Sequence, residues 1–304
     1  MRPISICRAA AALFCLLACV WNAAMADIQS AMRDFERRQY STAIAEFRQL
    51  AARGDKEAAY WLGRAYDAGE GLAKDPQLAL QWFMKAAEAD HDEAQRVVGV
   101  YYHEGVVGSP DPERAAVWYA RAARLGNAKA QRNLGQLYAA GIGVGRDYRR
   151  AAELFRQAAD QGNAKAMRNL GYLYFFGRGV AKDLERAADY FKQAAQAGLD
   201  RAAYNLGFVH YHGRGVEKDL ALAARHMTSA AESGDADAQL FLARMYLLGE
   251  GVTRDPEKAY FWALLGGLQE PRLAEWYFEQ LSGKLSEATR DRIRRAVQTW
   301  EPSS

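Results

Sequence analysis

Residues Ala166–Gly198 read AMRNLGYLYFFGRGVAKDLERAADYFKQAAQAG and contain two short helical patterns. The first pattern places small or apolar residues at the i, i+4, i+7 and i+8 positions, which form one face of a helix. These residues are Ala166, Leu170, Leu173 and Tyr174. Gly177 and Gly179 follow, and because glycine has no Cβ it readily adopts the positive φ that ends a helix. The sequence therefore predicts a helix that buries one stripe and stops near Gly177.

A second helix is predicted to begin after Asp183, whose carboxylate can accept a hydrogen bond from a backbone N–H of the first turn. Gly198 ends the pattern. The buried stripe of this helix comprises Ala187, Tyr190, Phe191, Ala194 and Ala195. Isolated helices of this length are marginal in water, and neither can bury its apolar stripe alone. The unit therefore needs neighbours.

The same unit recurs with a period of 36 residues. A Leu-Gly step occurs at Leu62-Gly63, Leu134-Gly135, Leu170-Gly171 and Leu206-Gly207, with near matches at Val98-Gly99 and Leu242-Ala243. The turn glycines are Gly69, Gly105, Gly141, Gly177, Gly213 and Gly249. The capping aspartates are Asp75, Asp111, Asp147, Asp183, Asp219 and Asp255. Several columns in phase indicate a protein built from tandem helical repeats.

The repeated pattern A-x-x-x-L-G-x-x-Y-x-x-G-x-G-V-x-x-D-x-x-x-A-x-x-W/Y-F-x-x-A-A-x-x-G resembles the Sel-one-like repeat, a relative of the tetratricopeptide repeat. The resemblance covers six repeats within residues 55–267. It implies an all-α fold, a right-handed α-solenoid of helix-turn-helix repeats with a groove. It also implies an adaptor or binding protein, and the family offers no catalytic residues to carry over.

Glycine inside a helix is unfavourable by about 1 kcal/mol relative to alanine. The glycine of the Leu-Gly step is therefore expected where two helix backbones approach closely. We expect its facing partners to be the Ala-Ala steps of the second helices, such as Ala194-Ala195.

Segments on either side of the repeats are predicted to cap them. Residues 27–54 keep the second-helix register but have lost the Leu-Gly step, which is typical of a degenerate N-terminal repeat. Residues 268–304 contain two further helical patterns, Glu270 to Leu281 and Ser286 to Trp300, and are predicted to be C-terminal capping helices.

Residues 1–26 have the features of a bacterial export signal. Arg2 and Arg8 precede a short apolar core, and Ala24-Met25-Ala26 offers a small-x-small cleavage site. We therefore expect a periplasmic protein that begins at Asp27. Alternatively, the run Leu16-Leu17-Ala18-Cys19 resembles a lipoprotein box, which would anchor the chain in a membrane through an acylated Cys19.

Cysteine use and charge narrow the classes of partner. All three cysteines, Cys7, Cys15 and Cys19, lie in this first segment, so no disulfide or cysteine metal site is expected beyond it. The formal net charge is +3, of which two charges come from Arg2 and Arg8. So small a charge argues against a nucleic-acid partner, because phosphate binding needs a clustered basic surface.

Two adjacent columns of the first helices carry polar residues that the repeat leaves free. They contain Arg96, Arg132 and Arg168 in one column and Asn133, Asn169 and Asn205 in the other. Asparagine can hydrogen-bond a peptide backbone through both amide ends, and arginine can bind a carboxylate. We expect a polar ladder that binds a protein or peptide in the groove. In the alternative interpretation, the asparagines bridge adjacent repeats and the arginines are only solvated.

A second set of free positions is apolar in the C-terminal half. Phe175, Phe176 and Tyr211, with Leu247 and Leu248, lie at the ends of first helices. They are candidates for a binding hot spot. They are equally consistent with packing under the C-terminal capping helices.

Signals of catalysis are weak. The sequence contains no HExxH, phosphate loop or GxSxG motif. His210 takes the tyrosine position of its repeat, and His210 and His212 would point to different sides of a helix. We expect no metal and no cofactor. The favoured function is a non-catalytic periplasmic scaffold for another exported or envelope protein. The alternatives are a factor that binds or hydrolyses cell-wall glycan, or a secreted host-interaction factor.

Overall fold

The computed structural model describes residues 27–303, and every regular element in that range is an α-helix. These residues form two compact units, of which the first ends at Arg146 and the second begins at Asp147. The predicted export signal, its cleavage site and the lipidation alternative at Cys19 lie outside the described residues. Between residues 27 and 303, no helix combines the length and the apolar character needed to span a bilayer.

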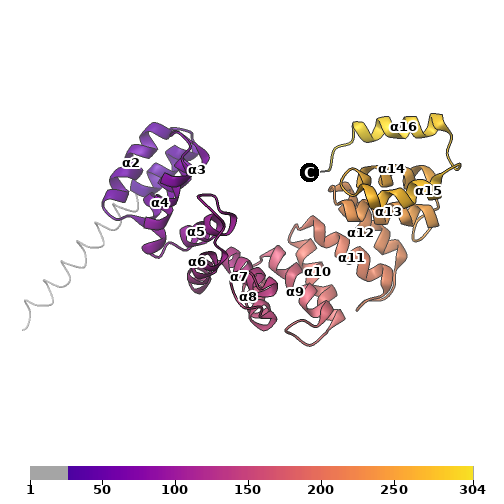
Figure 1. The fold of residues 1–304 in the computed structure, drawn as a ribbon, viewed down its shortest axis with the longest axis horizontal. Coiled ribbons are helices and arrows are strands. Elements are labelled where there is room, and N and C mark those ends of the chain that lie inside the picture. Colours follow the sequence, from indigo (N-terminus) through magenta and orange to yellow (C-terminus); the bar gives the residue numbers. More distant parts are fainter. Residues whose placement is uncertain (1–26, 304) are drawn as a thin grey trace, which may run out of the picture. The chain divides into compact units, whose positions relative to one another are not determined.

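The first unit is a stack of helix pairs. After a helix over residues 27–36 come α2 (Tyr40–Ala52), α3 (Lys56–Ala68), α4 (Pro76–Glu88), α5 (Asp92–Glu104), α6 (Pro112–Arg124) and α7 (Ala128–Ala140) (Figure 1). α3 packs on α4 and α5 on α6, so each repeat is a helix hairpin. Contacts of α2 with α3 and of α4 with α5 join neighbouring repeats. Phe47, Leu62 and Phe83 are among the fully buried side chains between the layers.

The second unit continues the pattern. Its helices are α8 (Tyr148–Asp160), α9 (Ala164–Phe176), α10 (Leu184–Gln196), α11 (Asp200–His212), α12 (Leu220–Glu232), α13 (Ala236–Leu248), α14 (Pro256–Gly267), α15 (Pro271–Leu281) and α16 (Glu287–Gln298). The odd-numbered helices from α3 to α13 are the first helices of the six repeats, and the even-numbered helices from α4 to α14 are the second helices. The hairpins here are α9 with α10, α11 with α12, and α13 with α14.

The helix ends follow the predicted punctuation. Each of the six capping aspartates accepts a hydrogen bond from a first-turn N–H of its helix. For example, Asp183 Oδ1 accepts from Arg186 N at 2.9 Å. All six turn glycines have a left-handed backbone, with φ between 63° and 77°. The helix ends predicted from the capping aspartates and the turn glycines are therefore confirmed.

The close approach predicted at the Leu-Gly step is confirmed, but the expected partner was wrong. A Cβ added to Gly171 would lie 2.7 Å from Cε1 of Phe191 and 3.2 Å from the carbonyl oxygen of Ala187. Gly63 and Gly99 face rings in the same way, and Gly207 faces the side chain of a methionine. The glycine thus makes room for a large side chain, not for the Ala-Ala step.

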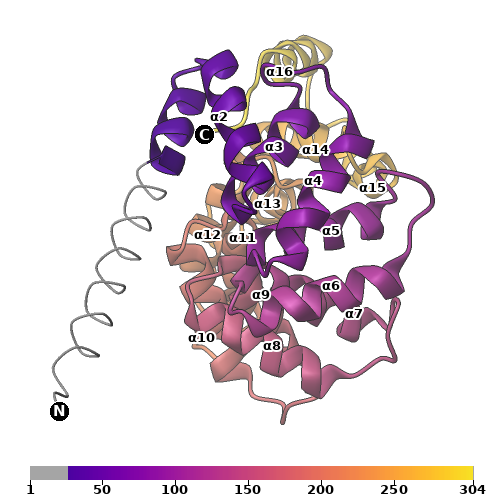
Figure 2. The same ribbon diagram turned by 90° about the vertical axis from the view of Figure 1, so that its left-hand side faces the viewer.

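The last two helices pack on the sixth repeat. α15 and α16 both contact α14, and α16 lies beside α14 in Figures 1 and 2. Ile293 of α16 is buried with Leu247, Tyr260 and Leu281. Ser286 caps α16 by accepting from Thr289 N at 3.2 Å, as its sequence position indicated. Apolar side chains of the sixth repeat are therefore covered within the chain itself.

Candidate functional site

Two pockets occupy equivalent places in the two units. The polar pocket, about 540 Å³, lies among α5, α6 and α7. Its lining includes Arg96, Val100, His103, Glu104, Tyr119, Arg132, Asn133 and Gln136. The aromatic pocket, about 270 Å³, lies among α9, α10 and α11. It is lined by Tyr172, Phe175, Phe176, Phe191, Tyr204, Asn205 and Phe208.

The two pockets are built by the same positions of the repeat. Each of the seven residues of the aromatic pocket has its counterpart in the polar pocket 72 residues earlier, which is two repeats. Two first helices form the walls, and a ring from the second helix between them, Tyr119 or Phe191, completes the lining. Only the asparagine, Asn133 or Asn205, is the same residue in both. The repeat therefore provides the pocket, and the variable positions determine its chemistry.

The two arginines of the polar pocket are bound to neighbours in the chain. Arg96 donates to both carboxylate oxygens of Glu93, at 2.9 and 2.8 Å. Burial favours the neutral form of Glu93, but hydrogen bonds from Arg96 and Asn127 outweigh it and lower the pKa of this carboxyl. Arg132 donates to Asn133 Oδ1 at 2.6 Å. The predicted Arg96, Arg132 and Asn133 thus meet in one pocket, where all three already have partners.

Rings and one amide form the aromatic pocket. Phe175 lies edge-on to Phe176 and Phe208, with ring centroids 5.0 and 6.2 Å apart. Phe176 is 55 % exposed, although it is a large apolar side chain. Asn205 is buried and accepts a hydrogen bond from the Tyr172 hydroxyl at 2.6 Å. Asn205 therefore bridges two adjacent repeats, as the alternative interpretation of the asparagine column states.

The remaining predicted residues lie elsewhere. Asn169 and Arg168 are half-buried on α9. Arg168 Nε is buried and has no hydrogen-bond partner among the described residues. Tyr211 is buried, packs edge-on against Phe241 and donates its hydroxyl hydrogen to Glu250. The apolar positions therefore separate into two groups: Phe175 and Phe176 line a pocket, whereas Tyr211 belongs to the core.

Leu247 and Leu248 also differ. Leu247 is buried against Ile293 and other residues of the C-terminal helices, while Leu248 is exposed. The expectation that part of this patch packs under the capping helices is confirmed for Leu247.

A larger cavity, about 680 Å³, lies among α10, α11 and α12 and contains no predicted site residue. His210 and His226 line it with their rings stacked 5.7 Å apart. The equivalent pair in the preceding repeat is Tyr174 and Tyr190, whose rings are also 5.7 Å apart. Imidazole is smaller than phenol, so these two substitutions help to open the cavity. Nowhere in residues 27–303 do three His, Cys, Asp or Glu side chains form a cluster that could hold a metal ion.

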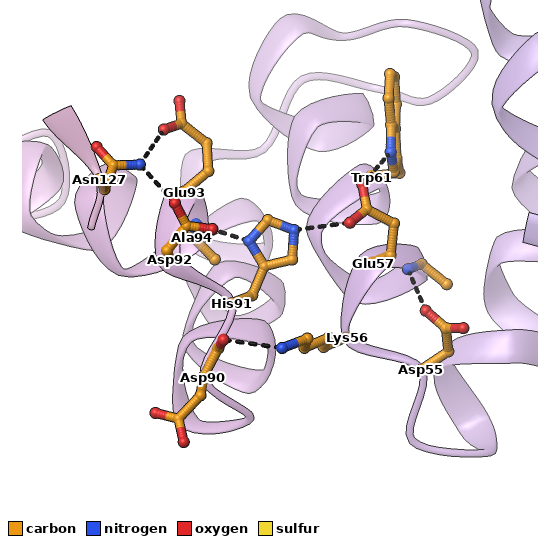
Figure 3. Close-up of polar contacts among 11 residues, drawn as sticks. Asp55, Lys56, Glu57, Trp61, Asp90, His91, Asp92, Glu93, Ala94 and Asn127 are labelled. Atoms are coloured by element: carbon orange, nitrogen blue, oxygen red, sulfur yellow. Dashed lines mark hydrogen bonds and ion pairs between the residues drawn. The ribbon is translucent and has the colours of Figure 1, made fainter. Parts of the chain in front are cut away.

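Polar contacts between repeats also occur at the starts of the first helices, and sequence reasoning missed them (Figure 3). His91 Nδ1 accepts from Ala94 N at 3.1 Å and so caps α5. The other ring nitrogen, Nε2, must therefore carry the proton, and it lies 3.1 Å from Glu57 of the preceding repeat. Glu57 also accepts from Trp61 Nε1 at 2.9 Å.

Asn127 acts in the same way one repeat later. Its Oδ1 caps α7 by accepting from Ala130 N, while its Nδ2 donates to Asp92 and Glu93 at 2.8 and 3.0 Å. We call this row of contacts the N-cap seam. Its sequence signal is the column of residues that precede each first helix: Asp55, His91, Asn127, Asn163, Leu199 and Asp235. Five of these six side chains cap the helix that follows, and Leu199 does not. Because the five are of three different kinds, the column did not stand out in the sequence.

The N-cap seam gives the first unit a testable pH dependence. The hydrogen bond from His91 lowers the pKa of Glu57 below its ordinary value of 4.5, against the opposing effect of burial. A carboxyl whose pKa is depressed on folding stabilises the protein above its unfolded pKa, and this stabilisation is lost as the pH falls through the folded pKa. We expect the urea midpoint of the wild type to fall more steeply below about pH 4.5 than that of Glu57→Gln. The effect is modest because Glu57 is 41 % exposed.

Urea titrations followed by tryptophan fluorescence at a series of pH values measure these midpoints. The exposed Glu88 of α4 provides the matched control, because Glu88→Gln removes the same charge without touching the seam. Parallel pH profiles for Glu57→Gln and the wild type would contradict this role of the pair.

Comparisons with known proteins relate these repeats to others. A family model described as the Sel1 repeat matches residues 56–91, 92–127, 128–163, 164–199, 200–235 and 236–271. No curated protein matches the chain. A solved structure that is similar is a protective antigen present in uropathogenic Escherichia coli strains, which displays an SLR fold. It is 28 % identical, with a TM-score of 0.84 over 91 % of this chain, and the chain spans 60 % of the antigen's length.

A Sel1 repeat protein from Oxalobacter formigenes is also similar. It is 29 % identical with a TM-score of 0.73, and the match covers 79 % of this chain and 96 % of that protein. Together with the helices described above, these likenesses show an all-α solenoid of tandem repeats.

Proposed function

Since the chain belongs to the Sel1 repeat family, whose members generally mediate protein–protein interactions, we propose that it is a non-catalytic scaffold for a protein or peptide partner. The partner binds in pockets between the first helices of adjacent repeats. The proposed place of action is the periplasm, on the basis of the export signal in residues 1–26, with anchoring through Cys19 as the alternative. The proposed partner is therefore another exported or envelope protein.

The observation that carries this proposal is the aromatic pocket. A water-soluble surface rarely leaves large apolar side chains exposed around a concavity unless they bind something. Here Phe176 is more than half exposed at a pocket that is lined by six aromatic residues, Phe176 included, and one asparagine. Buried aromatic anchors with a few polar groups are typical of the centre of a protein interface.

Site-specific photo-crosslinking in living cells tests the proposal. The probe replaces Phe176, and the control probe replaces Glu153, an exposed residue of α8 that lines none of the described pockets. We expect a discrete protein adduct from position 176 and none from position 153. Equal adducts at both positions, or no adduct at position 176, would contradict binding at this pocket.

A further inference from the structure

We infer that the aromatic pocket and Arg168 together recognise an extended segment of a protein partner that carries an aromatic side chain and a carboxylate two residues apart. This inference rests on the proposed function and specifies the chemistry of the segment that binds. It follows from the size and lining of the pocket, from the loss of an ion pair between equivalent repeats, and from the geometry of a helix face.

The pocket suits one aromatic side chain. A cavity of roughly 150 Å³ lined by apolar side chains accommodates benzene, and the aromatic pocket holds about 270 Å³. Its walls present both faces and edges of rings, because Phe175 is nearly perpendicular to Phe176. Aromatic rings prefer edge-to-face and offset contacts, which add to the gain from burial. No carboxylate lines this pocket, so an apolar guest meets no buried acid there.

Arg168 supplies the charge. It is the counterpart, two repeats later, of Arg96, which lines the polar pocket. Arg96 is neutralised by Glu93 through two hydrogen bonds. The counterpart of Glu93 in the fourth repeat is Lys165, so the acid that would pair with Arg168 is replaced by a second cation. This explains the buried Nε of Arg168 that has no hydrogen-bond partner in the part of the chain that the structure describes.

A carboxylate of the partner takes the role that Glu93 has in the earlier repeat, and it binds the outer nitrogens of the Arg168 guanidinium because Nε is buried. Arginine and a carboxylate form charge-assisted, often bidentate hydrogen bonds, which are stronger than neutral ones. A third cation, Arg178, strengthens the preference for an acidic segment, because its guanidinium lies 5.1 Å from the ring centre of the exposed Phe176. Along the chain, Arg168 and Arg178 thus flank the pocket residues that α9 contributes.

Helix geometry sets the spacing. Arg168 and Tyr172 are four residues apart on α9 and therefore lie on one face, about one helical pitch of 5.4 Å from each other. An extended chain advances about 3.3–3.6 Å per residue and places alternate side chains on the same side. Two residues of an extended segment therefore span the distance between the guanidinium and the pocket with both side chains facing α9.

Selection from a random peptide library displayed on phage tests the inference with the purified protein. We expect enriched peptides in which an aromatic residue and Asp or Glu are separated by one residue. Arg168→Glu should reverse the preference and enrich Lys or Arg at that position. The matched control is Arg149→Glu, which makes the same charge reversal at an exposed residue of α8 and should leave the preference unchanged.

Lys165→Glu is the sharper variant, because it restores at an exposed position the acid that pairs with Arg96 in the earlier repeat. In fluorescence anisotropy with an enriched peptide, amidation of the peptide's acid should weaken binding about tenfold for the wild type. It should have little effect for Lys165→Glu, in which Arg168 is already paired.

Each result decides between the hypotheses. Enriched peptides without an acid, or an acid preference that survives Arg168→Glu, would overturn the inference. If position 176 still forms a discrete adduct in cells in that case, the proposed scaffold function stands. An adduct absent from position 176 contradicts the proposed function itself, whatever the peptides show.

Discussion

A Gly171→Leu variant is expected to lose about 1–3 kcal/mol of unfolding free energy, or more, because the site has no room for a side chain. Even the first carbon of a side chain would lie 2.7 Å from the ring of Phe191, well inside van der Waals contact. The ring cannot move away easily, since Phe191 is 2 % exposed in the core between α9 and α10. Urea unfolding followed by circular dichroism measures the loss.

The sixth repeat shows how the same contact tolerates a larger residue. Ala243 takes the place of the glycine there, and the position equivalent to Phe191 is Ala263. Both alanines are fully buried. We therefore expect Gly171→Ala to be destabilising alone and to be partly rescued by a second substitution, Phe191→Ala, although the double variant still loses the burial of a ring.

A second glycine gives the control for general effects of substitution. A Cβ at Gly145 would meet no atom within 4 Å. Gly145→Ala should therefore leave the urea midpoint close to that of the wild type. If Gly171→Leu also leaves it unchanged, the packing of glycine against the ring does not contribute to stability.

The helices and their ends could be predicted because they depend on local chemistry. An aspartate such as Asp183 caps its own helix, and a glycine such as Gly177 ends the one before it, within a few residues of chain. These signals repeat every 36 residues, so six copies of each supported the same assignment. The family resemblance then supplied the stacking of the hairpins.

Contacts between helices were harder to predict, because they depend on side-chain volume and not on spacing alone. The pairing of Gly171 with Phe191 is visible in the sequence only when the glycine column is compared with the ring column, where Ala243 and Ala263 change together. The Ala-Ala step was the wrong partner because small residues were expected to face small residues. A large ring against a glycine fills the same space.

The candidate site could be predicted only in part, because it too depends on contacts between helices. Comparison of equivalent positions in the first helices identified Arg96, Asn133 and Asn205 as candidates. Each pocket, however, is lined by residues from three helices. Phe191 lines the aromatic pocket and belongs to a second helix, so a search along the first helices could not find it. Likewise, the exchange of Glu93 for Lys165 one turn away is what leaves Arg168 without the partner that Arg96 has.

The second large loss of stability is expected on substitution of Gly215, which lies in the turn between α11 and α12. A Cβ there would lie 2.0 Å from the carbonyl oxygen of Leu184, the first residue of α10. Because that atom is backbone at a capped helix start, it cannot move aside as a side chain can. Equivalent backbone contacts with the preceding repeat occur at Gly143, Gly179 and Gly251, whereas Gly71 faces the side chains of Tyr40 and Ile44. At these positions the turn glycine therefore allows one hairpin to pack closely against its predecessor, which its local sequence does not reveal. The second repeat has Val107 in this column.

Gly215→Ala is destabilised both by backbone strain and by steric overlap, whereas Gly198→Ala has the strain alone and serves as the control. Both glycines have positive φ, +78° and +81°, so alanine is strained by about 1–2 kcal/mol at either position. A Cβ at Gly198 meets no atom within 4 Å, whereas at Gly215 it overlaps the backbone of α10. We expect thermal unfolding to show a further loss of about 1–3 kcal/mol for Gly215→Ala over Gly198→Ala. Equal losses would mean that the turn shifts to relieve the overlap, and that the stacking of hairpins rests on the side chains between the helices instead.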